Sequence, residues 1–160
     1  MACELDKYVG REVPLEFHIG CPDVLPEEAD WLPVGALRAK EMNGTWDTVD
    51  GTTDDSVGSL RSNLATYQSL EFTADGTCKR ADGTLSNQTA LTKHFYSPVS
   101  TGGQPVVWLR MTFPDLTFVA FMLLTECSRS APHDEVTTFS ITATASESPF
   151  GIIVTDTPVV

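Results

Sequence analysis

The stretch EVTTFSITATAS, residues 135–146, decides the fold, because its side chains alternate between two chemical classes. The apolar side holds Phe139, Ile141, Ala143 and Ala145. The other side holds Val136, Thr138, Ser140, Thr142, Thr144 and Ser146. Successive side chains of a strand point to opposite faces of its sheet, so one face should be buried and the other exposed to solvent. The exposed face carries hydroxyls without a nucleophile and base, which favours a surface-building protein over an enzyme.

Earlier segments show related patterns. Residues 66–75 place Leu70 and Phe72 on one side and Ser69, Glu71 and Thr73 on the other. Residues 105–113 and 117–127 are separated by three residues and predict a hairpin. The second of these strands is apolar on both sides. It should therefore lie centrally in the domain or be covered by a neighbouring subunit.

Shorter strands are predicted at residues 13–19, 32–42 and 150–155. Residues 86–96 form the one good helix candidate, with Ser86 as its cap and with Leu91 and Phe95 on a shared face. The predicted fold class is mainly β: an antiparallel β-sandwich or open barrel with one flanking α-helix and a long inter-strand loop. We expect a single domain over residues 1–160, with an N-terminal arm (1–31), a long polar loop (43–63) and a C-terminal segment (147–160).

Length and composition limit the function classes. The 160 residues, 41% of them hydrophobic, suit one globular domain. No apolar run approaches the roughly 20 residues that span a bilayer, and the start lacks a secretion signal. The four cysteines (Cys3, Cys21, Cys78 and Cys127) lack zinc-site spacing, so we expect reduced thiols, no metal, no cofactor and no membrane contact.

The net charge of −12 is concentrated in one region. Residues 12–55 contain eleven acids against only Arg38 and Lys40, a net of 2 − 11 = −9. Because phosphate binding requires Lys and Arg, this chain should not hold nucleic acid. Such acidity suits solubility, and it could also repel nucleic acid.

The polar stretch at residues 43–63 is the first functional indication, because loops of this length are usually functional or disordered. Its acids include Asp47, Asp50, Asp54 and Asp55. They lack the alternating ligands and closing Glu of an EF-hand. A solvated acidic loop and a loop that contacts another subunit remain the two alternatives to a calcium site.

We find no sequence signature of catalysis. His18, His94 and His133 are far apart, and none lies in a recognisable catalytic motif. We therefore predict that the protein is not an enzyme, with a small hydrolase as a weak third interpretation.

The chain resembles the major tail tube proteins of long, non-contractile-tailed bacteriophages over roughly residues 34–154. The resemblance lies in Thr45-Trp46-Asp47-Thr48-Val49-Asp50, the loop at 54–58, and the strand ending Ala74-Asp75-Gly76. It continues in the helix at 86–96, the strands at 105–113 and 118–124, and the segment 136–141. Type VI secretion tube proteins share this fold.

The resemblance implies a virion structural protein, made in the host cytoplasm, that assembles into stacked hexameric rings. The rings form a tail tube through which DNA passes without specific binding. It also implies contacts with a tape measure protein and with tail tip and terminator proteins. In this family the long loop contacts the next ring, and its candidate residues here are Trp46, Asp47, Asp50, Asp54 and Asp55.

Two further sets of site residues follow from this interpretation. The candidate lumen face comprises Ser69, Glu71, Thr73, Thr138, Ser140, Thr142 and Thr144, with Arg110 as its single positive charge. The candidate subunit-interface strand contributes Phe118, Phe121, Met122 and Leu124. The alternative function is a monomeric β-sandwich that serves as a binding adaptor or capsid-decoration module.

Overall fold

A computed structural model describes residues 9–35, 37–55, 57–58, 60–78 and 87–157. The strands are β1 (Leu15–His18), β2 (Leu32–Pro33), β3 (Leu37–Asp50), β4 (Asn63–Thr77), β5 (Val106–Thr112), β6 (Leu116–Ser130), β7 (Thr138–Ala145) and β8 (Ile153–Asp156). The helices are α1 (Gln88–Tyr96) and three 3₁₀ turns, η1 (Gly10–Glu12), η2 (Glu28–Asp30) and η3 (Val99–Thr101).

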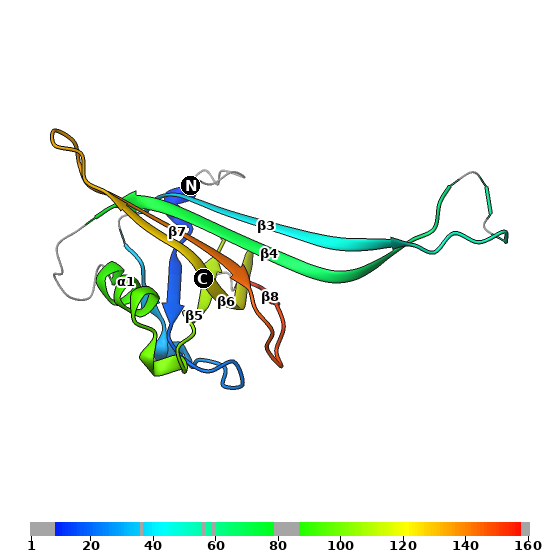
Figure 1. Ribbon diagram of the computed structural model, residues 1–160, viewed down its shortest axis with the longest axis horizontal. Helices are drawn as coiled ribbons and strands as arrows, with labels where there is room; N and C mark the ends of the chain where they lie inside the picture. The colour runs from blue at the N-terminus through cyan, green and yellow to red at the C-terminus, as the bar shows by residue number, and fades with distance from the viewer. Residues whose placement is uncertain (1–8, 36, 56, 59, 79–86, 158–160) are drawn as a thin grey trace, which may run out of the picture.

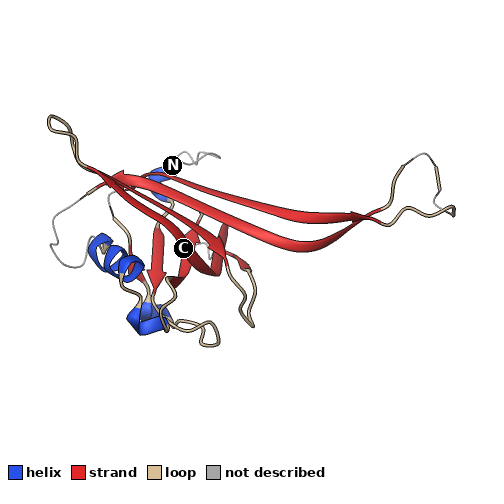
Figure 2. Ribbon diagram, viewed as in Figure 1, coloured by secondary structure: helices blue, strands red, loops and turns tan. Residues whose placement is uncertain are grey.

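All eight strands belong to one antiparallel sheet that does not close on itself. Its order is β2-β1-β5-β6-β7-β4-β3, and β8 pairs with the start of β6. The sheet curls, so that β3, β4 and β7 form one long layer above β1 and β5, with α1 at one end (Figures 1 and 2). The predicted class, mainly β with one flanking helix, is confirmed.

The long hairpin of β3 and β4 is the most unusual feature of the molecule. The strands are 14 and 15 residues long, and their distal parts extend well beyond the body (Figure 1). Residues 43–50 and 63–69 are exposed on both faces. The prediction of a loop over residues 43–63 is therefore wrong at its ends, because Asn43–Asp50 and Asn63 are in strands and only residues 51–62 connect them.

The main core fills the inside of the curled sheet. Each strand from β4 to β7 contributes alternate side chains, as the sequence pattern predicts. The side chains of Phe72, Val107, Met122, Phe139 and Ile141 are at most 2% exposed. Their burial fixes the register, because a slip of one residue would turn each of these side chains to the opposite face.

A second buried layer lies on the outer face of β5 and β6. Trp108 is fully buried there, contacts the rings of Phe121 and Phe150, and donates its indole N–H to the Cys21 carbonyl at 3.0 Å. The described part of the predicted N-terminal arm therefore packs on the body: β1 joins the sheet beside β5, and the segment after it covers Trp108. An indole buried with its N–H satisfied is a stable anchor for this segment.

Helix α1 is fixed to the sheet at both ends. The Gln88 side chain, 1% exposed, donates to the carbonyls of Gly35 and Thr77 at 2.8 and 3.0 Å. The Tyr96 hydroxyl donates to the Cys127 carbonyl at 2.9 Å. These bonds hold the helix across the end of the sheet that lies opposite the tip of the long hairpin (Figure 1).

Several predicted boundaries are corrected. Residues 32–42 are not one strand, because β2 ends at Pro33 and β3 begins at Leu37. The Asp75-Gly76 pair does not end a strand. Both residues belong to β4 and pair with β3 on one side and β7 on the other. The residue preceding α1 is Asn87, whose side chain donates to the Pro33 carbonyl, and the predicted cap Ser86 lies outside the described residues.

Candidate functional site

The residues predicted for the lumen face lie together on one side of the sheet. Glu71 pairs with Thr144 and Thr73 pairs with Thr142 across β4 and β7, and paired residues share a face. Ser140 and Thr138 continue the same row along β7. The structure thus collects these residues, predicted from two segments far apart in sequence, into a single polar surface.

This polar face continues onto β3 and β6 and is strongly acidic. Glu41 pairs with Thr73, Glu126 pairs with Thr142, and Asp75 pairs with Ser140. With Glu71 they make four exposed carboxylates. The described positions of β3, β4, β6 and β7 that share this face include no Lys or Arg.

Glu41, Asp75 and Glu126 were missed in the sequence analysis. Asp75 could have been found by extending the alternation seen in residues 66–75, and Glu41 only from the pairing of β3 with β4. Glu126 could not, because the register shifts between Leu124 and Glu126. Without that bulge, Glu126 would share a face with buried Leu124.

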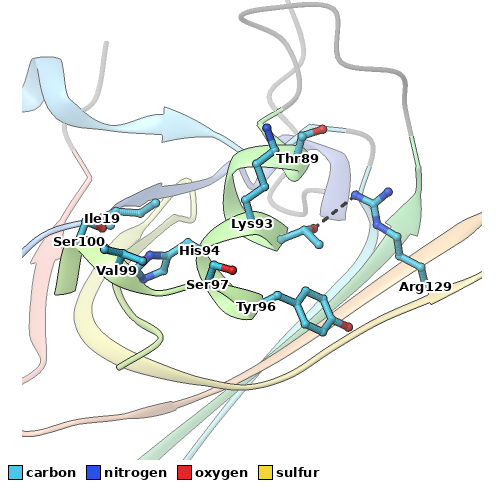
Figure 3. A pocket seen from close by; sticks show the side chains of 10 residues that line it. Ile19, Thr89, Lys93, His94, Tyr96, Ser97, Val99, Ser100 and Arg129 are labelled. Atoms are coloured by element: carbon cyan, nitrogen blue, oxygen red, sulfur yellow. Dashed lines mark hydrogen bonds between the residues drawn. The ribbon is translucent and has the colours of Figure 1, made fainter. Parts of the chain in front are cut away.

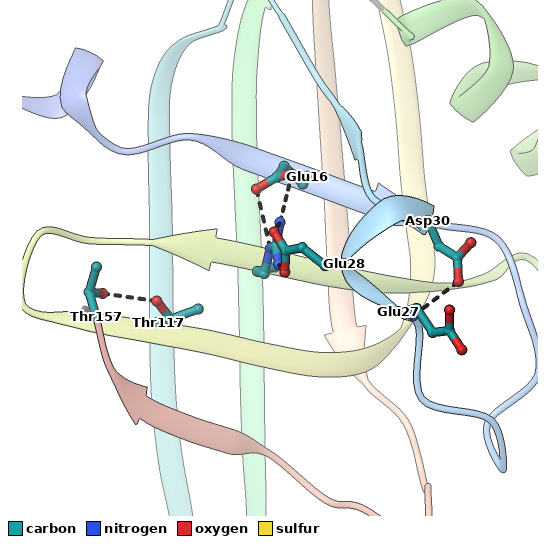
Figure 4. Close-up of polar contacts among 7 residues, drawn as sticks. Glu16, Glu27, Glu28, Asp30, Thr117 and Thr157 are labelled. Atoms are coloured by element: carbon teal, nitrogen blue, oxygen red, sulfur yellow. Dashed lines mark hydrogen bonds and ion pairs between the residues drawn. The ribbon is translucent and has the colours of Figure 1, made fainter. Parts of the chain in front are cut away.

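Arg110 does not belong to the polar face, contrary to the prediction. Its guanidinium binds Glu16 at 2.8 and 3.2 Å and Glu28 at 2.8 Å, and it lies 4.8 Å from the ring centre of Trp31. Figure 4 shows the two carboxylates converging from β1 and η2. Because the segment carrying Glu28 and Trp31 covers this side of β5, Arg110 serves as an internal clamp.

The candidate subunit-interface strand is also corrected. Met122 and Leu124 are 2% exposed within the main core, and Phe121 is 4% exposed beneath Trp108. Only Phe118 of the predicted set is half-buried. The strand is apolar on both faces because its own chain covers both, so these three side chains are not available to a neighbour.

The projecting hairpin exposes a mixed apolar and acidic surface. We call β3 residues 43–50, β4 residues 63–69 and the connection 51–62 the arm. Its exposed apolar residues are Trp46 (55%), Val49 (50%), Val57 (94%), Leu60 (83%), Leu64 (59%) and Tyr67 (77%). A two-stranded hairpin is only marginally stable in water. Covering these apolar side chains with another surface would therefore stabilise the arm.

The predicted loop acids all lie on the arm. Asp47 and Asp50 belong to β3, and Asp54 and Asp55 lie in its tip. Asp50 accepts hydrogen bonds from the Thr52 hydroxyl and amide at 2.5 and 2.9 Å, and these bonds lower its pKa. No group of three potential metal-ligating side chains occurs in the described part of the chain.

The polar face ends in two unpaired strand edges. Among the described residues, β3 pairs only with β4, and β6 beyond Leu124 pairs only with β7. The strands β3, β4, β7 and distal β6 thus form a four-stranded unit with an open edge on each side. Unpaired edges present N–H and C=O groups, which are templates for pairing with another chain, although the Cys127 carbonyl of distal β6 already accepts the Tyr96 hydroxyl.

A cleft of about 800 Å³ lies between α1, η3 and distal β6. Figure 3 shows Lys93, Tyr96, Val99 and Arg129 around it. Tyr96 and Val99 are 67% and 85% exposed. No described carboxylate lies within 4 Å of the Lys93 or Arg129 nitrogens, and Arg129 reaches only the Thr92 hydroxyl at 3.4 Å.

The remaining candidate groups that the structure describes form no site. Cys21, Cys78 and Cys127 are unpaired thiols, and Cys3 lies outside the described residues. His133 and Asp134 approach to 3.7 Å, but both side chains are more than nine-tenths exposed. No helix among the described residues is long and apolar enough to cross a membrane.

Comparison with solved structures identifies proteins of similar fold. A chain from the virion of a native gene transfer agent particle matches with a TM-score of 0.68 at 16% identity, covering 95% of this chain and all of the other. A chain from the tail of an empty gene transfer agent particle, solved with C6 symmetry, gives 0.66 at 17% identity, with the same coverage. The SPP1 tail tube gives 0.63 at 13% identity over 94% of this chain and 80% of that one.

These matches show that the chain has the fold found in phage-like tail tubes, over nearly its whole length. The predicted resemblance to tail tube proteins is thereby confirmed at the level of fold. No protein-family model matches the sequence, and no curated protein matches it.

Proposed function

We propose that this protein is the building block of a phage-like tail tube: copies form hexameric rings, the rings stack, and DNA passes through the lumen. The observation that carries the proposal is the four-stranded polar unit with two open edges. Its strands alternate in direction, so β3 of one copy can pair with distal β6 of the next in antiparallel fashion. The fold shared with tail tubes supports this arrangement.

Six copies would form a barrel of 6 × 4 = 24 strands lined by the polar face. At a spacing of about 4.8 Å, the circumference is about 115 Å before strand tilt widens it. Such a barrel would surround a DNA duplex with hydroxyls and carboxylates. Because this surface carries no cation in the described strands, it offers phosphates no fixed partner.

The arm would contact the next ring, with Trp46 as its apolar anchor. Trp46 is 55% exposed in a single chain, and tryptophan contributes large contact area at interfaces. The substitution Trp46→Ala should leave the domain folded but block tube growth. Leu32→Ala, which removes an exposed apolar side chain from β2, is the matched control and should assemble normally.

Electron microscopy and mass measurement of the purified protein test the proposal. We expect rings or tubes many times the 17.4 kDa monomer mass at micromolar concentration. A strict monomer from micromolar to millimolar concentration would refute the tube and favour the adaptor or capsid-decoration alternative. In the proposed role the protein is located in the virion tail, after synthesis in the host cytoplasm, and contacts tape measure, tip and terminator proteins.

A further inference from the structure

We propose that the cleft beside α1 is the receptor for the arm tip of a second copy of this chain. This inference rests on the proposed tube, and it names the surface that the arm binds. The tip supplies Asp54 and Asp55, and the cleft supplies Lys93 and Arg129.

The positions of the two surfaces support head-to-tail contact. The arm tip and α1 lie at opposite ends of the long axis of the molecule (Figure 1). The arm strands run about 20 Å from Gly44 to Asp50 at the usual rise per residue, and the tip extends further. A second copy displaced along this axis therefore brings its α1 end towards the first copy's arm tip.

The chemistry of the two surfaces is complementary. The tip combines two carboxylates with Val57 and Leu60, which are 94% and 83% exposed. The cleft combines two cations with the exposed Tyr96 and Val99 (Figure 3). Burying these exposed apolar side chains against one another would stabilise the contact. The opposite charges around them would make it specific for this partner.

Other cations among the described residues are less suited to receive the tip. Arg110 is clamped by Glu16 and Glu28, and Lys40 donates to the Val13 carbonyl. Arg61 lies on the arm itself, Arg11 lies in η1, and Arg38 lines a smaller cleft beside η1 and β3. Lys93 and Arg129 are the described pair that lines a large cleft at the end opposite the arm.

A charge exchange tests the contact. Lys93→Glu with Arg129→Glu should leave rings intact but raise the protein concentration needed for tubes by about tenfold or more, because every subunit of a ring loses the contact. Asp54→Lys with Asp55→Lys should have the same effect. Combining all four substitutions restores opposite charges and should return this concentration to within about threefold of the unmodified protein.

Two controls separate the possible outcomes. Arg11→Glu reverses an exposed cation outside the cleft and should assemble normally. Lys93→Glu alone changes an exposed side chain, and it replaces the double variant if loss of the Arg129–Thr92 contact prevents folding. Light scattering and micrographs are read at equal protein concentration for all variants.

The inference is overturned if the cleft variants form tubes at the unmodified concentration. It is equally overturned if each pair blocks stacking but the fourfold variant does not recover, since the tip would then bind elsewhere. Both results leave the tail tube itself in place. Only the absence of rings and tubes from the unmodified protein would contradict the proposed function.

Discussion

Adding lysines to the polar face should slow DNA passage in a salt-dependent way. The variant is Glu71→Lys with Thr142→Lys, on neighbouring strands β4 and β7. In each subunit the four carboxylates of the face become three, and two cations are added. The net charge of the face changes from −4 to −1, and a six-membered ring gains 12 lysines.

The magnitude follows from counterion release. Each phosphate neutralised by a lysine adds about 0.9 to the slope of log affinity against log salt. If only three of the 12 lysines of a ring contact phosphates at once, their contribution to the affinity for DNA is about 40-fold larger at 50 mM salt than at 200 mM salt. Screening limits the range over which a single exposed charge acts to about one Debye length, about 8 Å at physiological salt. The effect must therefore come from lysines repeated along the tube.

The assay measures DNA ejection kinetics from infectious particles whose tubes carry the variant. We expect assembly to be normal and ejection to slow most at low salt. Thr155→Lys with Asp156→Lys is the matched control, because it changes the charge equally on exposed β8, outside the four-stranded unit. Ejection at the unmodified rate from tubes shown to carry both lysines would refute the lumen assignment, and so would equal slowing by the control.

Three further predictions concern the single chain. Trp108→Ala should lower the free energy of unfolding by about 3–5 kcal/mol in urea titration, because it empties the second buried layer; Trp108→Phe should cost less. Arg110 holds the pKa of Glu28 below its ordinary value of 4.5, so this carboxylate stabilises the clamp at neutral pH. That contribution is lost as the pH falls through the lowered pKa. Trp31 fluorescence should therefore report a transition below pH 4.5 that Glu28→Gln abolishes. In native protein, exposed Cys21 should react with a thiol reagent much faster than Cys127, whose pKa is raised by burial, and four thiols should titrate after denaturation.

The body of the fold was predictable because its signal is local. Residues 70–77 of β4 and the whole of β7 each bury one face, and a period of two residues records this directly in the sequence. The polar face followed from the same signal, since Glu71 and Thr142 both lie opposite buried neighbours. What the alternation cannot supply is the pairing of β4 with β7, which joins residues about 70 positions apart.

The arm has the sequence pattern of a loop because neither of its faces is buried in a single chain. A strand without a buried face needs no apolar side chains at alternate positions, so the periodic signal is absent. Trp46, Val49 and Tyr67 are nevertheless residue types that favour strands. The prediction that a neighbouring subunit covers β6 is wrong for a related reason. Its two apolar faces were visible in the sequence, but the segment that covers Trp108 and Phe121 is irregular and carries no periodic signal.

The bulge in β6 divides one strand into two parts with different roles. Before it, Ala120, Met122 and Leu124 face the core; β5 pairs on one side, and β8 and then β7 pair on the other. After it, Glu126 turns to the polar face while Cys127 turns inward, and one edge of the strand is unpaired. The buried part can therefore stabilise the monomer before any neighbour is present, because its apolar surface is already covered. In the proposed tube, the distal part offers the hydrogen-bonding groups of its open edge to a second chain, apart from the Cys127 carbonyl that already accepts the Tyr96 hydroxyl. Edge pairing would then require no unfolding of the core.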